Sequence, residues 1–461
     1  MPLTILADLD VRNLLLQLTR QDVLDLQQSL ADALQYYSTT TDEESNACSS
    51  SNQSPRTALK RNNGQTTFLV PASSNDGIGV KTITLCTEGA AKKVGMWSAN
   101  TSLRKSSLSH QPTTTAVESQ PSAACFQSAK PKGSLTLFDD SGNPRALINT
   151  EEITAFRTAL ASTMLFQKRH NVRNVVVFGA GTQAYWHIRL ALLLRDSEIH
   201  HLDIINRDFE RVHHLLQRLY DPATELHRPK IRILTPIHGE YDRLLKSTVR
   251  ASRVIFLTTP SLTPLFPATY LTSTEGRKKG RYLAAVGSYQ PHMVEVHPDI
   301  LRQAVEPEHG HRHFHKHATR GGAVVVDSVD ACLAEAGEVI QARLRPEEVV
   351  ELGELVMLKR DAERRRAECE ARAGRKREAG VDDHGVGRQE VGKVHTRRGS
   401  REAKDEHMRA EDQASRGLVE WLTKGNVVYK SVGLGLMDVV VGNGLCRLAD
   451  ERGIGTRIEH F

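Results

Sequence analysis

One feature constrains this chain most: a short apolar run passes directly into a glycine-rich turn and then into an amphipathic stretch. The run is 175–178, the turn is Gly179-Ala180-Gly181-Thr182-Gln183-Ala184, and the amphipathic stretch continues to Arg195. This strand, turn and helix, with G-x-G-x-x-A spacing, are typical of a dinucleotide-binding βαβ unit. Gly181 lacks the Cβ that would block a pyrophosphate, and the helix N-terminus offers free N–H groups to it. A tight turn without a ligand gives the same letters, which is the alternative.

The second strand of this unit indicates which cofactor is bound. HLDIINRD (201–208) reads as that strand, and an NAD-specific site usually ends it with Asp or Glu to bind the ribose hydroxyls. Here Asn206 and Arg207 stand at the end. Because an arginine cannot accept a hydrogen bond but pairs well with a phosphate, the sequence favours NADP(H) over NAD(H). The alternative is that Arg207 is a solvated loop residue and Asp208 contacts the ribose.

Composition limits the class of protein. The 461 residues are enough for two domains with their own cores. The formal net charge is +6, but segment 352–417 holds many charges of both signs and few apolar residues. Such a segment predicts a disordered insertion rather than a nucleic-acid site. The six cysteines form no C-x-x-C pair, and no signal peptide or membrane-spanning run is visible. We therefore expect a cytoplasmic protein with neither a nucleic-acid nor a membrane partner.

Strands and helices alternate from 171 to about 345, as a doubly wound parallel sheet requires. We place the strands at 173–178, 201–205, 231–235, 253–258, 282–286 and 323–327. A dinucleotide-binding Rossmann domain is therefore expected over 151–351, with a His-rich insertion at 306–320. The five histidines of that insertion could bind a metal, but no carboxylate or cysteine frame supports them. We favour a surface insertion and expect no metal site.

The segments outside this region also show order. Residues 11–37 carry helical periodicity, 66–73 and 79–86 read as adjacent strands, and 134–148 reads as a hairpin. Residues 153–166 predict a helix that leads into the nucleotide domain. After the charged insertion, 418–458 resumes as an apolar strand, a turn and a helix. The insertion therefore interrupts a fold and does not separate two independent ones.

In this order the segments resemble the ornithine cyclodeaminase/mu-crystallin family. The resemblance is carried by FLVPAS, GVKTIT, LTLFDDSGNPRALINTEEITAFRTALAS, VVVFGAGTQA, FLTTPSLTPLF, AAVGSYQPHMVEV, VVVDSVDACLAEAGEV and NVVYKSVGLGLMDV. It covers most of 1–345 and 418–461. It implies a Rossmann-type doubly wound α/β domain beside an α+β substrate and dimerisation domain. The second domain would comprise 1–150 and 418–461, with flexible insertions at 39–55 and 98–132, and would form a homodimer.

The resemblance also implies the site residues. Lys81 in GVKTIT stands where the family has a pocket lysine, and Arg157 in FRTALAS where it has an arginine that binds the substrate carboxylate. Arg56 in SPRTALK matches a third, carboxylate-binding arginine. The alternatives for Lys81 and Arg157 are an exposed strand lysine and a salt bridge on a helix face. The expected cofactor-binding residues are Gly179, Ala180, Gly181, Thr182, Gln183, Asn206, Arg207, Thr259, Val286 and Gly287.

One position departs from the family pattern. Ornithine cyclodeaminases carry an aspartate shortly after the Val-Gly of a motif that ends in Pro-x-x-x-Glu. Alignment on Val286-Gly287, Pro291 and Glu295 puts Tyr289 there, and a phenol with a pKa of about 10 is no general base at neutral pH. The mu-crystallin branch also lacks this aspartate and is similar to NADPH-dependent ketimine reductases.

We therefore expect an NAD(P)H-dependent reductase of a small imine carboxylate, a ketimine or 1-pyrroline-2-carboxylate, or the reverse amino-acid dehydrogenation. One alternative is an ornithine cyclodeaminase, an NAD-dependent lyase that forms proline. The other is a non-catalytic, NADP-dependent protein that binds a small ligand.

Overall fold

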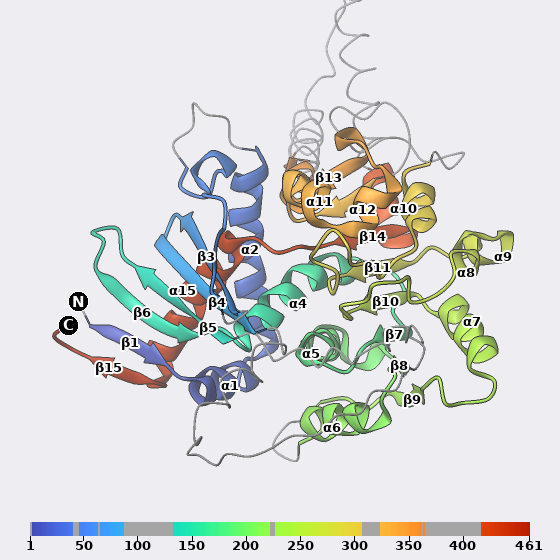
Figure 1. The fold of residues 1–461 in the computed structure, drawn as a ribbon, viewed down its shortest axis with the longest axis horizontal. Coiled ribbons are helices and arrows are strands. Elements are labelled where there is room, and N and C mark those ends of the chain that lie inside the picture. Colours follow the sequence, from blue (N-terminus) through green and yellow to red (C-terminus); the bar gives the residue numbers. More distant parts are fainter. Residues whose placement is uncertain are drawn as a thin grey trace, which may run out of the picture.

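The computed structural model describes residues 2–39, 46–62, 65–86, 132–221, 226–306, 323–361, 363–364 and 416–461. Two sheets with helices packed between them form the architecture (Figure 1). In the described part of the chain one sheet has eight strands and the other has seven. The α/β fold class predicted from the sequence is therefore confirmed.

The eight-stranded sheet is the Rossmann sheet, and every neighbouring pair in it is parallel. Its order is β13-β12-β14-β11-β10-β7-β8-β9. The strands are β7 (Asn174–Phe178), β8 (His201–Ile205), β9 (Lys230–Leu234), β10 (Val254–Leu257), β11 (Tyr282–Ala285), β12 (Val324–Val326), β13 (Val349–Glu351) and β14 (Val427–Lys430). Strand order reverses between β7 and β10, which is where open α/β sheets bind ligands.

Helices cover both faces of this sheet. They include α5 (Thr182–Arg195), α6 (Phe209–Leu219), α7 (Tyr241–Ala251), α8 (Thr269–Thr272), α9 (Thr274–Arg277), α10 (Pro298–Val305), α11 (Val329–Glu335) and α12 (Gly337–Ala342). The central strands read as unbroken apolar runs because both of their faces are buried. The expected strands were placed correctly to within about one residue at each end, but β13 was not foreseen.

Strand β14 corrects the expected domain division. The tail 418–461 was assigned to the α+β domain, yet Val427–Lys430 lies in the Rossmann sheet, paired with β11 on one side and β12 on the other. All four of its residues are buried. A short run that is apolar on both faces is typical of an interior parallel strand, and this is why the segment joins that sheet.

The seven-stranded sheet is mixed and has the order β15-β1-β6-β5-β4-β3-β2. Its strands are β1 (Leu3–Leu6), β2 (Thr57–Lys60), β3 (Gln65–Ser74), β4 (Gly77–Cys86), β5 (Lys132–Phe138), β6 (Pro144–Asn149) and β15 (Thr456–Ile458). Along β5, Leu135 and Leu137 are fully buried, and the alternating residues Ser134 and Thr136 point to the opposite, half-buried face. This period of two puts one face of the sheet on the core.

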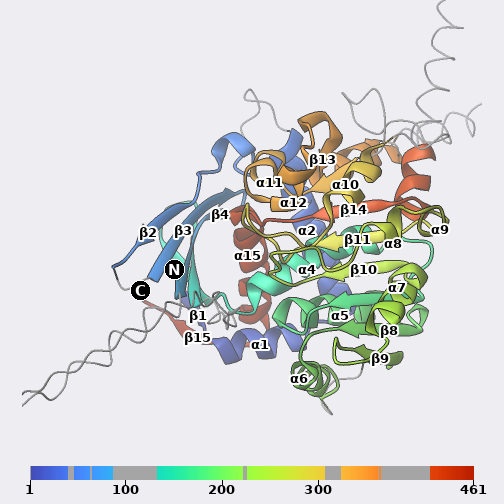
Figure 2. The same cartoon turned by 45° about the vertical axis from the view of Figure 1, so that its right-hand side comes forward.

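Four long helices accompany this sheet, and three of them lie between the two sheets: α2 (Arg20–Thr39), α4 (Ile153–Phe166) and α15 (Gly435–Arg452) (Figure 2). The fourth, α1 (Asp8–Leu16), packs against β1 and β6. Helix α15 packs on β3, β4 and β5 and contacts α4, which in turn contacts α5 and β11. Twelve of the fourteen residues of α4 are buried. One continuous apolar cluster therefore joins both domains.

Parts of the expected insertions are ordered. Within 46–55, residues Ser50–Asn52 form a short 3-10 helix and Cys48 is buried. The Gln53 side chain donates to Ser73 O at 3.0 Å and accepts from Ser73 N at 3.1 Å. These contacts attach the segment to β3, so this part is not the flexible insertion that we expected. Residues 40–45, 98–131 and 307–320 of the expected insertions lie outside the described residues.

The predicted bounds of the charged insertion, 352–417, were also too wide. Residues 352–361 are helical, with Leu352 and Leu355 buried, and Arg360 bonds to Asp32 and Gln35 of α2. At the other end, 416–424 is helical, and Trp421 is buried. The expectation of disorder is therefore wrong for 352–361 and 416–417, because apolar side chains at these ends reach the core. The positions 365–415 lie outside the described residues.

These boundaries predict how the segment responds to deletion. Replacing 365–415 with a short Gly/Ser linker should leave the thermal midpoint nearly unchanged, because the sequence there offers few apolar residues to bury. Joining Glu354 to Gly417 should instead destabilise the fold, since it removes buried Leu355, which is worth about 2–5 kcal/mol. Differential scanning calorimetry measures both. An equal loss in the two variants would mean that 365–415 also packs on the core.

Candidate active site

The glycine turn links β7 to α5 and has the geometry of a phosphate-binding loop. Gly179 has a φ of +111°, and a Cβ there would lie 2.7 Å from Thr258 Oγ1, so only glycine fits. A Cβ on Gly181, the N-cap of α5, would meet no atom within 4 Å. No side chain caps this helix end. Open space in front of uncapped N–H groups is the arrangement that binds an anion.

The neighbouring strand ends complete a site that fits a dinucleotide. Thr258 and Thr259 follow β10, and Gly287 follows β11, at the point where the strand order reverses. Thr259 Oγ1 and Gln183 Oε1 are buried, and neither has a hydrogen-bond partner among the described residues. A Cβ on Gly287 would lie 2.4 Å from Thr259 N, so the two loops are in close contact. Buried polar atoms without partners at a glycine turn are what a bound dinucleotide would satisfy.

The end of β8 presents the arginine noted in the sequence. Arg207 is exposed, and Asn206 Nδ2 donates to Asp208 O at 2.7 Å. The Asp208 carboxylate accepts from Glu210 N at 2.9 Å and so caps α6. It also lies 3.7 Å from Arg211. Asp208 is therefore turned toward its own helix, and Arg207 is the residue that projects from this strand end.

A buried cluster of charges lies between the two domains. Lys81 Nζ on β4 donates to Asp438 Oδ1 on α15 at 2.7 Å, and Arg157 Nε on α4 donates to the same oxygen at 3.3 Å. Exposed fractions of these three side chains are 2%, 3% and 8% for Lys81, Asp438 and Arg157. Burial lowers the pKa of Lys81 to about 8, against the opposing effect of Asp438. Lys81 is therefore a buried lysine, and it shares the partner Asp438 with Arg157.

The two terminal nitrogens of Arg157 have no carboxylate partner among the described residues. Apart from Asp438, its described partner is Met437 Sδ, 3.6 Å from Nη1. Gly433 lies beside it, with a φ of +89°, and a Cβ there would come within 2.7 Å of both Nη atoms. The loop 431–434 connects β14 to α15, so the same short segment touches the Rossmann sheet and the charged cluster. A planar guanidinium whose terminal nitrogens lack a carboxylate partner in the described part of the chain has the geometry to bind an anion in a bidentate manner.

Two residues singled out in the sequence lie elsewhere. Arg56 forms an ion pair with Glu335 of α11 and shares no described carboxylate with Lys81 or Arg157. Tyr289 is 38% exposed, and partial burial raises the pKa of its phenol. A phenol with a raised pKa stays protonated at neutral pH, as the sequence argument requires.

Asp438 was missed from the sequence. Its signal was a single carboxylate inside the apolar run LGLMDVVV, on a helix of which twelve residues are buried. A lone acid in such a run needs a cationic partner, because an unpaired buried charge is too costly. The sequence could have shown that a partner exists, but not that it is Lys81, 357 positions away.

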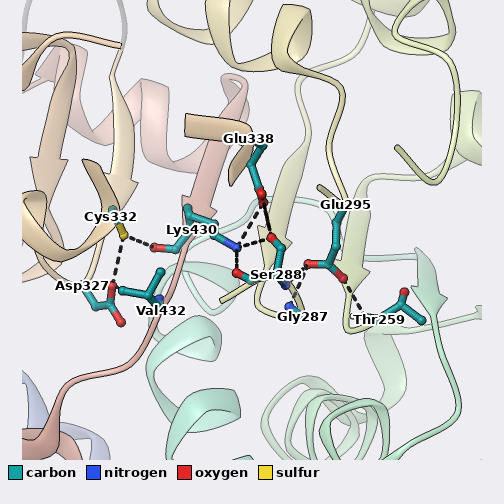
Figure 3. A network of polar contacts seen from close by, with 9 residues as sticks. All are labelled: Thr259, Gly287, Ser288, Glu295, Asp327, Cys332, Glu338, Lys430 and Val432. Atoms are coloured by element: carbon teal, nitrogen blue, oxygen red, sulfur yellow. Dashed lines mark hydrogen bonds and ion pairs between the residues drawn. The ribbon is translucent and has the colours of Figure 1, made fainter. Parts of the chain in front are cut away.

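A second polar network holds the carboxyl ends of β10, β11, β12 and β14 together (Figure 3). Lys430 Nζ bonds to Ser288 O, to Ser288 Oγ at 2.6 Å and to Glu338 Oε1 at 3.0 Å. Asp327 accepts from Gly433 N at 2.6 Å and from Ser431 Oγ at 2.8 Å. The loop that touches Arg157 is thereby fixed to the Rossmann sheet.

Neither a membrane-spanning helix nor a cluster of three potential metal ligands occurs among the described residues. None of the described helices has both the length and the apolar character to cross a membrane. In the same part of the chain, no three His, Cys, Asp or Glu side chains converge as metal ligands. The five histidines at 309–317 lie outside it.

The sequence model of the ornithine cyclodeaminase/mu-crystallin family matches residues 134–350. The family resemblance inferred from the motifs is thus confirmed. An uncharacterized protein of Saccharomyces cerevisiae is 27% identical over 247 residues, which are 48% of this chain and 62% of that protein. This chain therefore spans less than two thirds of the yeast relative. A Delta(1)-pyrroline-2-carboxylate reductase of Bacillus cereus is 24% identical over 415 residues, 88% of each chain.

A solved structure with the same fold is Thermococcus litoralis Delta(1)-pyrroline-2-carboxylate reductase in complex with NADH and L-proline. It covers 99% of this chain and 100% of its own, with a TM-score of 0.58 and 15% identity. The structure of a lysine cyclodeaminase covers 100% of this chain and 96% of its own, with a TM-score of 0.57 and 15% identity. Because a reductase and a cyclodeaminase are similar to this chain to nearly the same degree, the fold does not distinguish between these two activities.

Proposed function

We propose that this chain is an NAD(P)H-dependent oxidoreductase that reduces a small imine carboxylate, a ketimine or 1-pyrroline-2-carboxylate, to the amino acid. The observation that carries the proposal is the buried cluster of Lys81, Asp438 and Arg157. It offers an ammonium and an arginine fork one loop away from the carboxyl edge of a dinucleotide-binding sheet. The names of the Bacillus relatives support the same chemistry.

Each cluster residue has a role that its contacts support. The two Nη atoms of Arg157 bind the substrate carboxylate, and the ammonium of Lys81 donates a proton to the imine nitrogen. Asp438 holds both cations at fixed positions through one oxygen. The nicotinamide, when bound, supplies hydride to the imine carbon. Arg56 would contact the substrate carboxylate only if its ion pair with Glu335 were broken.

The proposal is tested by following oxidation of NADPH with a panel of cyclic and linear imino acids. Turnover of at least one cyclic imine carboxylate is expected. Thermal stabilisation by the cofactor, without turnover of any imine, would favour a binding protein instead.

A cyclodeaminase is the second candidate, and one observation favours it. Asp438 supplies a buried carboxylate beside Lys81, which the alignment lacked at Tyr289. Against it, one oxygen of Asp438 already accepts from both Lys81 and Arg157. Release of ammonia from L-ornithine without added reductant would decide for the lyase.

Asp438→Asn should move the pH dependence of imine reduction. The proposed acid is the protonated form of Lys81, with a pKa of about 8, so kcat should fall as pH rises through that value. Asp438 raises this pKa, whereas burial and Arg157 lower it. The variant should therefore lose activity at a lower pH than the wild type. A pH profile of kcat measures this, and an unchanged alkaline limb would exclude Lys81 as the acid.

We infer that the cofactor is NADP(H) in preference to NAD(H). Arg207 is exposed at the end of β8, and the carboxylate that follows it, Asp208, caps α6. This arrangement suits a 2′-phosphate better than two ribose hydroxyls. The titles of two similar structures name NADH and NAD+, each for its own protein.

Arg207→Asp should reverse this preference. Loss of a charged contact to the 2′-phosphate should weaken NADPH binding about 10- to 100-fold, and NADH binding much less. Fluorescence titration of both reduced cofactors measures the ratio. Arg211→Asp on α6, which already pairs with Asp208, is the matched control. An unchanged ratio in the Arg207 variant would show that this residue does not read the 2′ position.

We also propose a cytoplasmic homodimer. Opposite α15, the seven-stranded sheet exposes Ile78 and Leu147, which are 53% and 39% exposed. A second copy on this apolar face would cover it. Cys48, Cys332 and Cys446 are free, buried thiols, which fits a reducing compartment. Light scattering should give twice the chain mass; a monomer would contradict the dimer.

A further inference from the structure

Glu295 binds the backbone of two cofactor-site loops at once (Figure 3). Its Oε1 accepts from Thr259 N at 2.6 Å, and its Oε2 accepts from Gly287 N at 2.7 Å and from Ser288 N at 3.2 Å. The side chain is fully buried. One carboxylate therefore satisfies three peptide N–H groups from the ends of β10 and β11. It leaves Thr259 Oγ1, a buried hydroxyl without a partner among the described residues, at the cofactor site.

The same loop is supported from the opposite side. Ser288 Oγ donates to Glu338 on α12 at 2.6 Å, and Lys430 at the end of β14 bonds to both residues. Lys430 and Glu338 are both 0% exposed. The segment Gly287–Ser288 is thus held by two N–H groups that donate to Glu295 and by the Ser288 carbonyl, which accepts from Lys430. Buried charges of this kind are retained where they fix a geometry.

The position of these two loops, after β10 and β11, indicates which half of a bound dinucleotide they would contact. A dinucleotide crosses the switch point with its pyrophosphate on the glycine turn after β7. Its adenosine half lies toward β8, where Arg207 stands, so its nicotinamide half lies toward β10 and β11. That side also faces the loop at Gly433, which touches Arg157. The strand ends held by Glu295 therefore lie between the cofactor turn and the charged cluster.

We propose that Glu295 is a positioning residue for the nicotinamide half of the cofactor, acting through the peptide groups at Thr259 and Gly287. This inference rests on the proposed function for the identity of the cofactor, but not for the reaction. Glutamine at this position keeps the shape of the side chain but replaces one acceptor oxygen with a donor. That NH2 group would face a peptide N–H, so at least one loop must move.

The experiment compares two ligands on the same protein. Reduced NADPH and 2′-phospho-ADP-ribose, which lacks the nicotinamide ring, are titrated against the wild type and Glu295→Gln by calorimetry. We expect the variant to bind NADPH about 10- to 100-fold more weakly and 2′-phospho-ADP-ribose less than 2-fold more weakly. Equal weakening of both ligands, or of neither, would overturn the proposal.

Two further variants separate positioning from folding. Glu351→Gln removes another carboxylate that accepts one backbone N–H, from Val329 at 2.8 Å, at the far edge of the sheet on β13. It should change the thermal midpoint without changing either affinity. If Glu295→Gln does not fold, Glu295→Asp keeps the charge and should show the same selective loss to a smaller extent. Because binding is the readout, failure of imine turnover in the wild type would count against the proposed function and leave this test intact.

Discussion

Lys81→Met should lower kcat for imine reduction by about 100- to 1000-fold, the contribution expected of a positioned general acid. Methionine fills a similar volume but has no proton to give. The affinity for NADPH should survive, because Lys81 lies on β4 and contacts Asp438 rather than the glycine turn. The substrate KM should change far less than kcat, since the proposed carboxylate contact of Arg157 is kept in this variant. Steady-state kinetics at saturating NADPH measure both constants.

The pH profile makes this prediction specific. With a pKa of about 8 in the wild type, Lys81 is mostly charged at pH 7 and neutral above pH 9, so kcat should fall between them. The variant should lack this limb. Lys132→Met, an exposed lysine on the adjacent strand β5, is the matched control and should behave as the wild type. A normal kcat in Lys81→Met would contradict the proposed acid.

Much of the Rossmann domain could be predicted, because local signals specify it. The glycine turn and the apolar strands each follow from a short stretch of sequence, whereas the roles expected of Lys81 and Arg157 came from the family resemblance. Strand β14 shows the limit: its four residues predict a strand, but not that it lies between β11 and β12. That position depends on pairing with two strands that are distant from it in the sequence.

The site was predictable only in part, for a related reason. Asp438 and Glu295 are single carboxylates in the sequence, and their partners lie on other elements. Glu295 stands between two valines and Asp299 follows a proline, but neither pattern shows that Glu295 binds the N–H groups of two loops or that Asp299 is exposed. Burial decides between them, and burial depends on the tertiary fold. Arg56 shows the opposite case, since a motif match cannot reveal that Glu335 is its partner.

Arg157→Ala should act on the substrate KM, in contrast to Lys81→Met. If the fork binds the carboxylate in the ground state and the transition state alike, its loss raises KM with a smaller effect on kcat. Removing a buried charged pair should cost about 2–4 kcal/mol, roughly 30- to 1000-fold in kcat/KM. Arg157 also lowers the pKa of Lys81. The alkaline limb of the remaining activity should therefore move to higher pH, opposite to its shift in Asp438→Asn.

Two further variants identify what Arg157 contributes. Arg157→Lys keeps a positive charge but loses the planar fork, so it should recover only part of the lost kcat/KM. Arg169→Ala removes another buried arginine, which follows the end of α4 and donates to the backbone carbonyls of Leu422 and Gly425 rather than to a carboxylate. It should lower stability but leave KM near the wild-type value. If Arg157→Ala and Arg169→Ala affected KM alike, Arg157 would be a structural residue, and the carboxylate would have to bind elsewhere.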